Sequence, residues 1–197
     1  MNKQGKEEFL AVGEISDFVD AVTGESSTRI LLGGGYITRV PKRLLTLLGS
    51  CVAVCLFDPD AGVGGMNHFM LPQRGPNIPL PDDVRFGEDA LPWLLHGAVE
   101  LGADRNRLQA KIFGGASAMG PNNRVGIENI DFAHRFLKQH RIGIKAEEVG
   151  KRVSRQIRFD TDTGRAFVRY VDSGHGRVLI GKEQAAVAQA KAEISEA

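Results

Sequence analysis

A cysteine just before one predicted strand and a histidine within the next could serve as a nucleophile and its base. Cys51 follows a Gly-Ser pair and precedes the apolar run 52–58, and His68 lies in the next apolar segment, 63–71. A thiol is a weak nucleophile until a neighbouring base or cation converts it to a thiolate. The two residue types therefore predict acyl-transfer chemistry, provided that the fold brings the side chains together.

The loop between the two strands decides whether Cys51 and His68 share a face. Residues 58–62 carry the proline and glycine typical of a tight turn. With a two-residue loop, His68 lies directly opposite Cys51. With a four-residue loop, it lies opposite Ala53 and diagonal to Cys51, on the same face. A three-residue loop turns His68 to the other face unless a bulge at Gly64–Gly65 restores it.

Simpler interpretations compete with this dyad. A cysteine in an apolar strand is often a small buried side chain, and a histidine there is often structural. Cys55 lies in mid-strand with no adjacent turn, so we expect it in the core. A metal site formed by Cys51, Cys55 and His68 is weakly supported, because a Cys-x3-Cys spacing is unusual for zinc and no fourth ligand is evident.

Two segments closely resemble the CheD family of bacterial chemoreceptor glutamine deamidases. They are LLGSCVAVCLFDP, residues 47–59, and GGMNHFMLP, residues 64–72. Similarity continues in KIFGGAS (111–117), in Val125-Gly126 with Asn129, and in DTDTGR (160–165) with Val168-Arg169. The resemblance extends over residues 30–172.

The resemblance implies that Cys51 is the nucleophile and His68 the base of a protein-glutamine glutaminase. It also implies a third member of the triad, a threonine upstream of the cysteine, which corresponds to Thr46. Its spacing differs by one residue from that in some members, and Ser50 is a rival hydroxyl. Asn67 resembles the asparagine that orients histidine in papain-like enzymes, but adjacent strand residues point to opposite faces.

Further residues are candidates for binding the substrate. Backbone N–H groups around Gly49, Ser50 and Cys51 could stabilise an oxyanion, because a glycine turn allows close approach of the backbone. The glycine turn after the predicted strand 109–113 could line the cleft, chiefly through Gly114, Gly115 and Ser117. The triple glycine at 33–35 lacks the Lys-Ser/Thr of a phosphate loop, so we expect no nucleotide cofactor. The weak cysteine spacing likewise leads us to expect no metal.

Composition limits the class of protein. The 197 residues suffice for one sizeable core, and 25 basic against 24 acidic residues provide no electrostatic reason to bind nucleic acid. Two cysteines, a charged N-terminus and the lack of an apolar run of roughly 18 residues predict a cytoplasmic protein without membrane insertion.

The pattern of elements predicts an α/β fold with a mixed sheet. Helices are expected at 88–101 and 129–140, a strand at 142–149, and a hairpin at 154–171. The irregular, proline-rich segment 71–85 could form a wall of the cleft. The resemblance implies a single-domain layered α/β/α sandwich at 29–181. It is preceded by a polar, partly ordered extension, 1–28, and followed by a polar helical or frayed tail, 182–197, which could also dock a partner.

Three functions remain open on this basis. The resemblance implies deamidation of glutamines in the cytoplasmic region of methyl-accepting chemotaxis receptors, the implied partners. Some relatives instead bind and regulate a CheC-type phosphatase, which makes such a phosphatase a second candidate partner. A different Cys–His acyl-transfer enzyme, such as a protease or a transglutaminase-like protein, is the third alternative.

Overall fold

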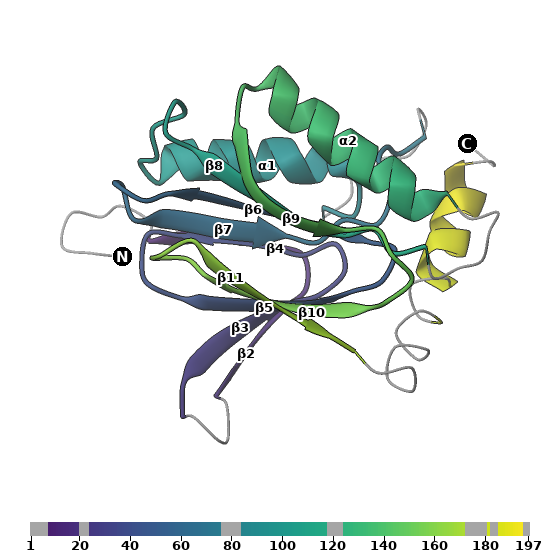
Figure 1. Ribbon diagram of the computed structural model, residues 1–197, viewed down its shortest axis with the longest axis horizontal. Helices are drawn as coiled ribbons and strands as arrows, with labels where there is room; N and C mark the ends of the chain where they lie inside the picture. Colours follow the sequence, from purple (N-terminus) through teal and green to yellow (C-terminus); the bar gives the residue numbers. More distant parts are fainter. Residues whose placement is uncertain are drawn as a thin grey trace.

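Two β-sheets stacked face to face form the body of the molecule, and helices cover one of them (Figure 1). The computed structural model describes residues 8–19, 24–75, 84–117, 124–171, 181 and 185–194. Within these residues the first sheet has the order β1-β4-β7-β6-β8-β9 and the second β11-β10-β5-β3-β2. The first comprises β1 (Phe9–Val12), β4 (Gly35–Thr38), β7 (Val63–Asn67), β6 (Val52–Asp58), β8 (Gln109–Gly114) and β9 (Gly143–Val149). The second comprises β11 (Arg165–Tyr170), β10 (Arg155–Asp160), β5 (Arg43–Leu48), β3 (Ser26–Ile30) and β2 (Ile15–Val19).

Both sheets are mixed, as the sequence predicts. β8 and β9 are parallel, as are β3 and β5, and the other pairs are antiparallel. Helices α1 (Gly87–Glu100) and α2 (Val125–Gln139) pack on the first sheet. The α/β class is therefore confirmed. The layers differ from the expected α/β/α sandwich. Helices cover one face of the first sheet, and the second sheet covers its other face, where the sandwich would have more helices.

The central strand β6 is buried on both faces, which explains its unbroken apolar run. Its even-numbered residues Val52, Val54 and Leu56 join the core beneath the helices. Its odd-numbered residues, including Cys51 just before the strand and Cys55 within it, join the core between the sheets. The side-chain alternation of a strand thus directs both cysteines toward the second sheet.

Several elements extend beyond the ranges predicted from sequence. Residues 9–19, which the composition assigns to a polar extension, form β1 and β2 and add one edge strand to each sheet. Helix α2 begins at Val125, four residues before the predicted start. Residues 185–194 are helical. Most of the proline-rich segment, 76–83, lies outside the described residues.

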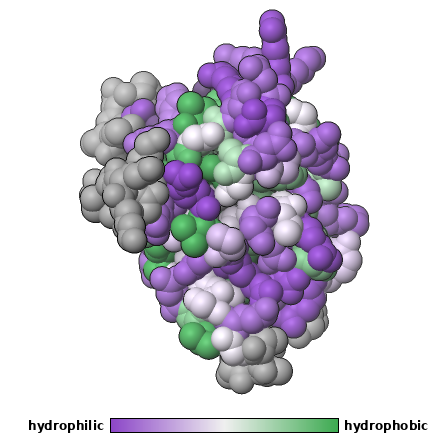
Figure 2. Space-filling model, turned by 90° about the vertical axis from the view of Figure 1, so that its left-hand side faces the viewer, coloured by the Kyte–Doolittle hydropathy of each residue, from purple (hydrophilic) through white to green (hydrophobic). Residues whose placement is uncertain are grey.

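Apolar side chains are largely enclosed between these layers. Figure 2 shows the end of the molecule remote from the C-terminal helix, where hydrophilic residues predominate and apolar ones form small separate patches. Among the described residues, no helix has the length and hydropathy needed to cross a membrane.

Candidate active site

The β6–β7 hairpin places Cys51 and His68 on the same face of the first sheet. Cys55 pairs with Met66, and an isolated bridge joins Val52 to Phe69. This register corresponds to a four-residue turn at 59–62, one of the alternatives considered from sequence. His68 therefore lies opposite Ala53 and diagonal to Cys51, facing the second sheet.

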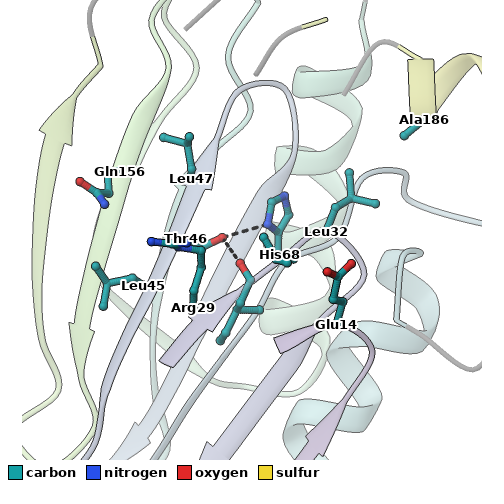
Figure 3. Close-up of a pocket in the computed structure, with 11 residues that line it drawn as sticks. Glu14, Arg29, Leu32, Leu45, Thr46, Leu47, His68, Gln156 and Ala186 are labelled. Atoms are coloured by element: carbon teal, nitrogen blue, oxygen red, sulfur yellow. Dashed lines mark hydrogen bonds between the residues drawn. The ribbon is translucent and has the colours of Figure 1, made fainter. Parts of the chain in front are cut away.

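Thr46 of β5, on the facing sheet, holds the imidazole of His68. Its Oγ1 lies 2.9 Å from His68 Nδ1 and 2.8 Å from the carbonyl oxygen of Ile30 (Figure 3). A hydroxyl has one proton, and the carbonyl can only accept. Thr46 therefore donates to Ile30 and accepts from Nδ1–H, which leaves the lone pair of His68 on Nε2. The arrangement selects the tautomer that a general base on the Nε2 side requires.

Burial keeps this imidazole neutral. His68 is 3% exposed, and its Nε2 has no hydrogen-bond partner among the described residues. Burial lowers the pKa of His68 to about 4, with a smaller opposing effect from the carbonyl of Ile30. At neutral pH the ring can accept a proton. Cys51 is 0% exposed, so both groups are shielded from solvent.

The glycine turn after β8 holds the loop that carries Cys51 through two backbone hydrogen bonds. The N–H of Gly115 donates to the Cys51 carbonyl at 2.7 Å, and the N–H of Ala116 donates to that of Gly49, also at 2.7 Å. Gly114 has a φ of +105°, and a Cβ there would lie 2.2 Å from the Cys51 carbonyl oxygen. The glycine turn after β8, predicted to line the cleft, therefore packs directly against the backbone of Cys51.

Asn129, near the N-terminal end of α2, connects the two segments of the site. Its Nδ2 donates to the carbonyl of Ser50 at 3.2 Å and to that of Met70 at 2.8 Å. Ser50 precedes Cys51 and Met70 follows His68, so one buried amide spans both. Sequence reasoning noted Asn129 as part of a motif but assigned it no contact, because its partners lie far away along the chain.

Arg155, at the start of β10, was missed by sequence reasoning. The guanidinium is fully buried and donates to the carbonyl of Gly114 at 3.2 Å and to those of Glu148 and Gly150. Burial lowers the pKa of Arg155. Its partners belong to the first sheet and the following loop, so Arg155 links the two sheets beside the glycine turn. An arginine in a polar strand pattern carries no sequence signal for this position.

A cavity of about 670 Å³ adjoins the Thr46–His68 pair. Figure 3 shows the charged Glu14 and Arg29, the amide of Gln156 and several leucines around it. Ala186 of the C-terminal helix also lines it. Its mixed walls provide apolar surface together with hydrogen-bonding groups, which is typical of a binding site.

Other predicted residues have separate locations. The Oδ1 of Asn67 accepts from the N–H of Val54 at 2.9 Å, on the side remote from His68. The backbone N–H of Ser117 donates to the carbonyl of Lys151 at 2.8 Å, at the edge of the described region. Cys55 is 0% exposed in the core as predicted, and burial raises the pKa of its thiol. No group of three or more potential metal ligands occurs among the described residues.

Comparison with known proteins yields consistent matches. The family model described as CheD chemotactic sensory transduction matches residues 70–170. A probable chemoreceptor glutamine deamidase CheD of Hahella chejuensis is 36% identical over 164 residues, 82% of this chain and 78% of the relative. A similarly named protein of Dechloromonas aromatica is 34% identical over 168 residues, 84% of each chain. One from a Caulobacter species is 38% identical over 157 residues, 79% of this chain and 84% of the relative.

Proposed function

The chain belongs to the CheD family, and we propose that it hydrolyses the side-chain amide of glutamines in chemoreceptors. The products are protein-bound glutamate and ammonia. Its relatives are named for this activity. The cytoplasmic part of a methyl-accepting receptor is the proposed partner, and the cytoplasm the proposed location. No cofactor is needed, because thiol, imidazole and water suffice for the reaction.

The proposed mechanism uses Cys51 as nucleophile and His68 as base. The Nε2 of His68 accepts the thiol proton while the sulfur attacks the carboxamide carbon of the substrate glutamine. Backbone N–H groups of the Gly49–Cys51 loop stabilise the oxyanion. The imidazolium then protonates the departing nitrogen, and ammonia is released, which leaves the substrate acyl group bound to Cys51 as a thioester. Water that has lost a proton to His68 attacks the thioester, which yields glutamate and restores the thiol.

The observation that carries this proposal is the hydrogen-bonded chain from Ile30 through Thr46 to His68. It leaves a neutral imidazole with its basic nitrogen unpaired, on the face shared with Cys51. The unpaired Nε2 is thus free to accept the thiol proton, as the proposed mechanism requires.

The matched cysteines provide a direct test. Cys51→Ala should abolish ammonia release from a purified receptor fragment, whereas Cys55→Ala should retain it, because Cys55 is enclosed in the core. Mass spectrometry of the fragment should show the mass change of amide-to-acid conversion at particular glutamines with the wild type and with Cys55→Ala. Ammonia release by folded Cys51→Ala would refute the assignment of the nucleophile. Cleavage of the receptor backbone, or transfer to an added amine, would indicate a different acyl-transfer reaction.

A further inference from the structure

The C-terminal helix, residues 185–194, lies at the catalytic end of the sandwich. In Figure 1 this yellow helix stands beside the start of α2. Its Val187 and Ala190 are 4% and 1% exposed, and both belong to the apolar cluster that includes Cys51. The same cluster contains residues that follow His68, precede α1 or begin α2, namely Met70, Leu71, Phe86 and Val125.

Two further observations show where the ends of this helix lie. Ala186 lines the cavity that Thr46 and His68 also line. At the other end of the helix, Ile194 lies against Gly75, where an added Cβ would be 3.2 Å from Ile194 Cγ2. The helix thus extends from the cavity beside His68 to the segment after β7.

This position conflicts with the access that a protein substrate needs. Cys51 is 0% exposed and His68 is 3% exposed. A glutamine on another protein must bring its carboxamide carbon to bonding distance of the sulfur. Residues 185–194 pack in the apolar cluster that contains Cys51 and line the cavity that His68 lines, so their displacement would open a route to the site.

The composition of the helix shows what kind of partner fits this surface. Residues 185–194 read AAVAQAKAEI. Val187 and Ala190 are buried and Ala186 and Ile194 partly buried, whereas the other alanines face outward with Gln189 and Lys191. The contact between this helix and the body depends mainly on Val187, Ala190 and Ile194. The small side chain of Ala190 lets the helix backbone approach the surface closely. So small an apolar contact can be displaced by a longer helix that offers the same small residues.

We propose that the surface beneath residues 185–194 is the docking site for a glutamine-bearing helix of the substrate that presents a similar small apolar face, and that residues 185–194 compete for it within the chain. This inference rests on the proposed deamidation, since it specifies how the receptor reaches Cys51. The C-terminal helix then acts as a lid that lowers activity until a receptor helix replaces it.

A pair of matched substitutions opens the lid or leaves it closed. Ala190→Glu places a carboxylate at a buried position, and Ala192→Glu places the same group on the exposed side of the same helix. The probe is a polyethylene-glycol maleimide, too bulky for the cavity, with Cys51→Ala as the background. Ala190→Glu should label at Cys51 at least about tenfold faster than Ala192→Glu, because a buried unpaired charge is strongly unfavourable. Equal labelling rates in the two folded variants would overturn the proposal.

A disulfide tests the opposite state and does not depend on the Ala190 variant folding. A Cβ at Gly75 would lie 3.5 Å from that of Ile194, within the range of about 3.5–4.5 Å that disulfides span. Oxidised Gly75→Cys/Ile194→Cys should lose labelling of Cys51 and ammonia release from a receptor fragment, and reduction should restore both. Wild type and the Gly75→Cys single variant, treated identically, control for oxidation of Cys51. An oxidised double variant as active as its reduced form would overturn the lid.

The two readouts separate failure of the lid from failure of the proposed function. If labelling of Cys51 rises in Ala190→Glu and falls in the disulfide variant while no form releases ammonia, the lid is supported and deamidation is refuted. Ammonia release that is unchanged by Ala190→Glu and by the disulfide would support deamidation and refute the lid.

Discussion

At the scale of single residues, a threonine orients the proposed base where other triads use a carboxylate. The hydroxyl of Thr46 is committed to the Ile30 carbonyl, so it can only accept from His68. A neutral acceptor stabilises an imidazolium less than a carboxylate does, which agrees with the lowered pKa of His68. The site therefore favours a neutral base that takes the thiol proton during attack.

Replacement of Thr46 tests this orientation. Thr46→Val keeps the shape but removes the acceptor for Nδ1–H, and we expect kcat/KM for receptor deamidation to fall about tenfold to a hundredfold. Thr46→Ser should retain most activity, because it keeps the hydroxyl. Thr28→Val, at another buried threonine of the second sheet, is the control. Equal activities of Thr46→Val and the wild type would show that the hydroxyl does not position the base.

The lowered pKa of His68 predicts a pH-dependent stability. The folded pKa is about 4 and the ordinary value is 6.5. Below the ordinary value the unfolded chain binds a proton that the folded chain does not, so the free energy of unfolding falls with pH until the folded pKa is reached. Between about pH 8 and about pH 5, the wild type should lose about 2 kcal/mol more than His68→Gln, measured by urea unfolding. Parallel curves for the two proteins would contradict the shift.

At the scale of elements, the glycine turn after β8 positions the loop that carries the nucleophile. Gly114 adopts a left-handed conformation against the Cys51 carbonyl, and Gly115 donates to that same carbonyl. The turn was expected to border the substrate, and its contacts show that it also supports the backbone of Cys51. Asn129 of α2 supports the same loop from the Ser50 side.

Alanine substitutions at two glycines with nearly equal φ separate the effect of backbone strain from the effect of displacing the Cys51 loop. Gly114 has φ +105° and Gly102 has φ +104°, but nothing lies within 4 Å of a Cβ at Gly102. Gly114→Ala should push the Cys51 loop away and lower kcat by about a hundredfold, since small misplacements of reacting groups have effects of this size. Gly102→Ala should show only the backbone strain, about 1–3 kcal/mol in unfolding, with activity retained. Equal activities in the two variants would contradict this role of the turn.

At the scale of the whole molecule, the site exists only where the two sheets meet. Cys51 and His68 come from the first sheet and Thr46 from the second. Arg155 links the sheets at this end through carbonyls of Gly114, Glu148 and Gly150. Its charge is buried, so the sheet interface depends on these bonds being complete.

Removal of this link should destabilise the whole fold. Arg155→Met leaves several buried carbonyls without a donor, and we expect a loss of about 3–5 kcal/mol in the free energy of unfolding. Arg158→Met, on the same strand but with a side chain that stacks on Phe167 nearer the surface, should cost about 1 kcal/mol or less. Chemical denaturation of the two variants measures the difference. A similar small loss in both would indicate that Arg155 is replaceable.

Local patterns were sufficient for much of the fold and for the central pair of the site. The apolar run 52–58, the turn at 58–62 and the period of the strands placed Cys51 and His68 on one face in two of three registers. They also assigned Cys55 to the core. These features depend on neighbours in the chain, so a single sequence contains the information.

Long-range contacts decided the rest. The register became certain only through pairing across the sheet. The hairpin of β10 and β11 was predicted locally, but its pairing with β5, β3 and β2 into a second sheet was not, and β1, β2 and the link through Arg155 had no local signal. Thr46 approaches His68 because β5 and β7 lie in facing sheets, and Asn129 reaches Ser50 because α2 packs over the first sheet. Such contacts arise from how separate elements pack together, and that packing is a property of the tertiary structure rather than of any short segment.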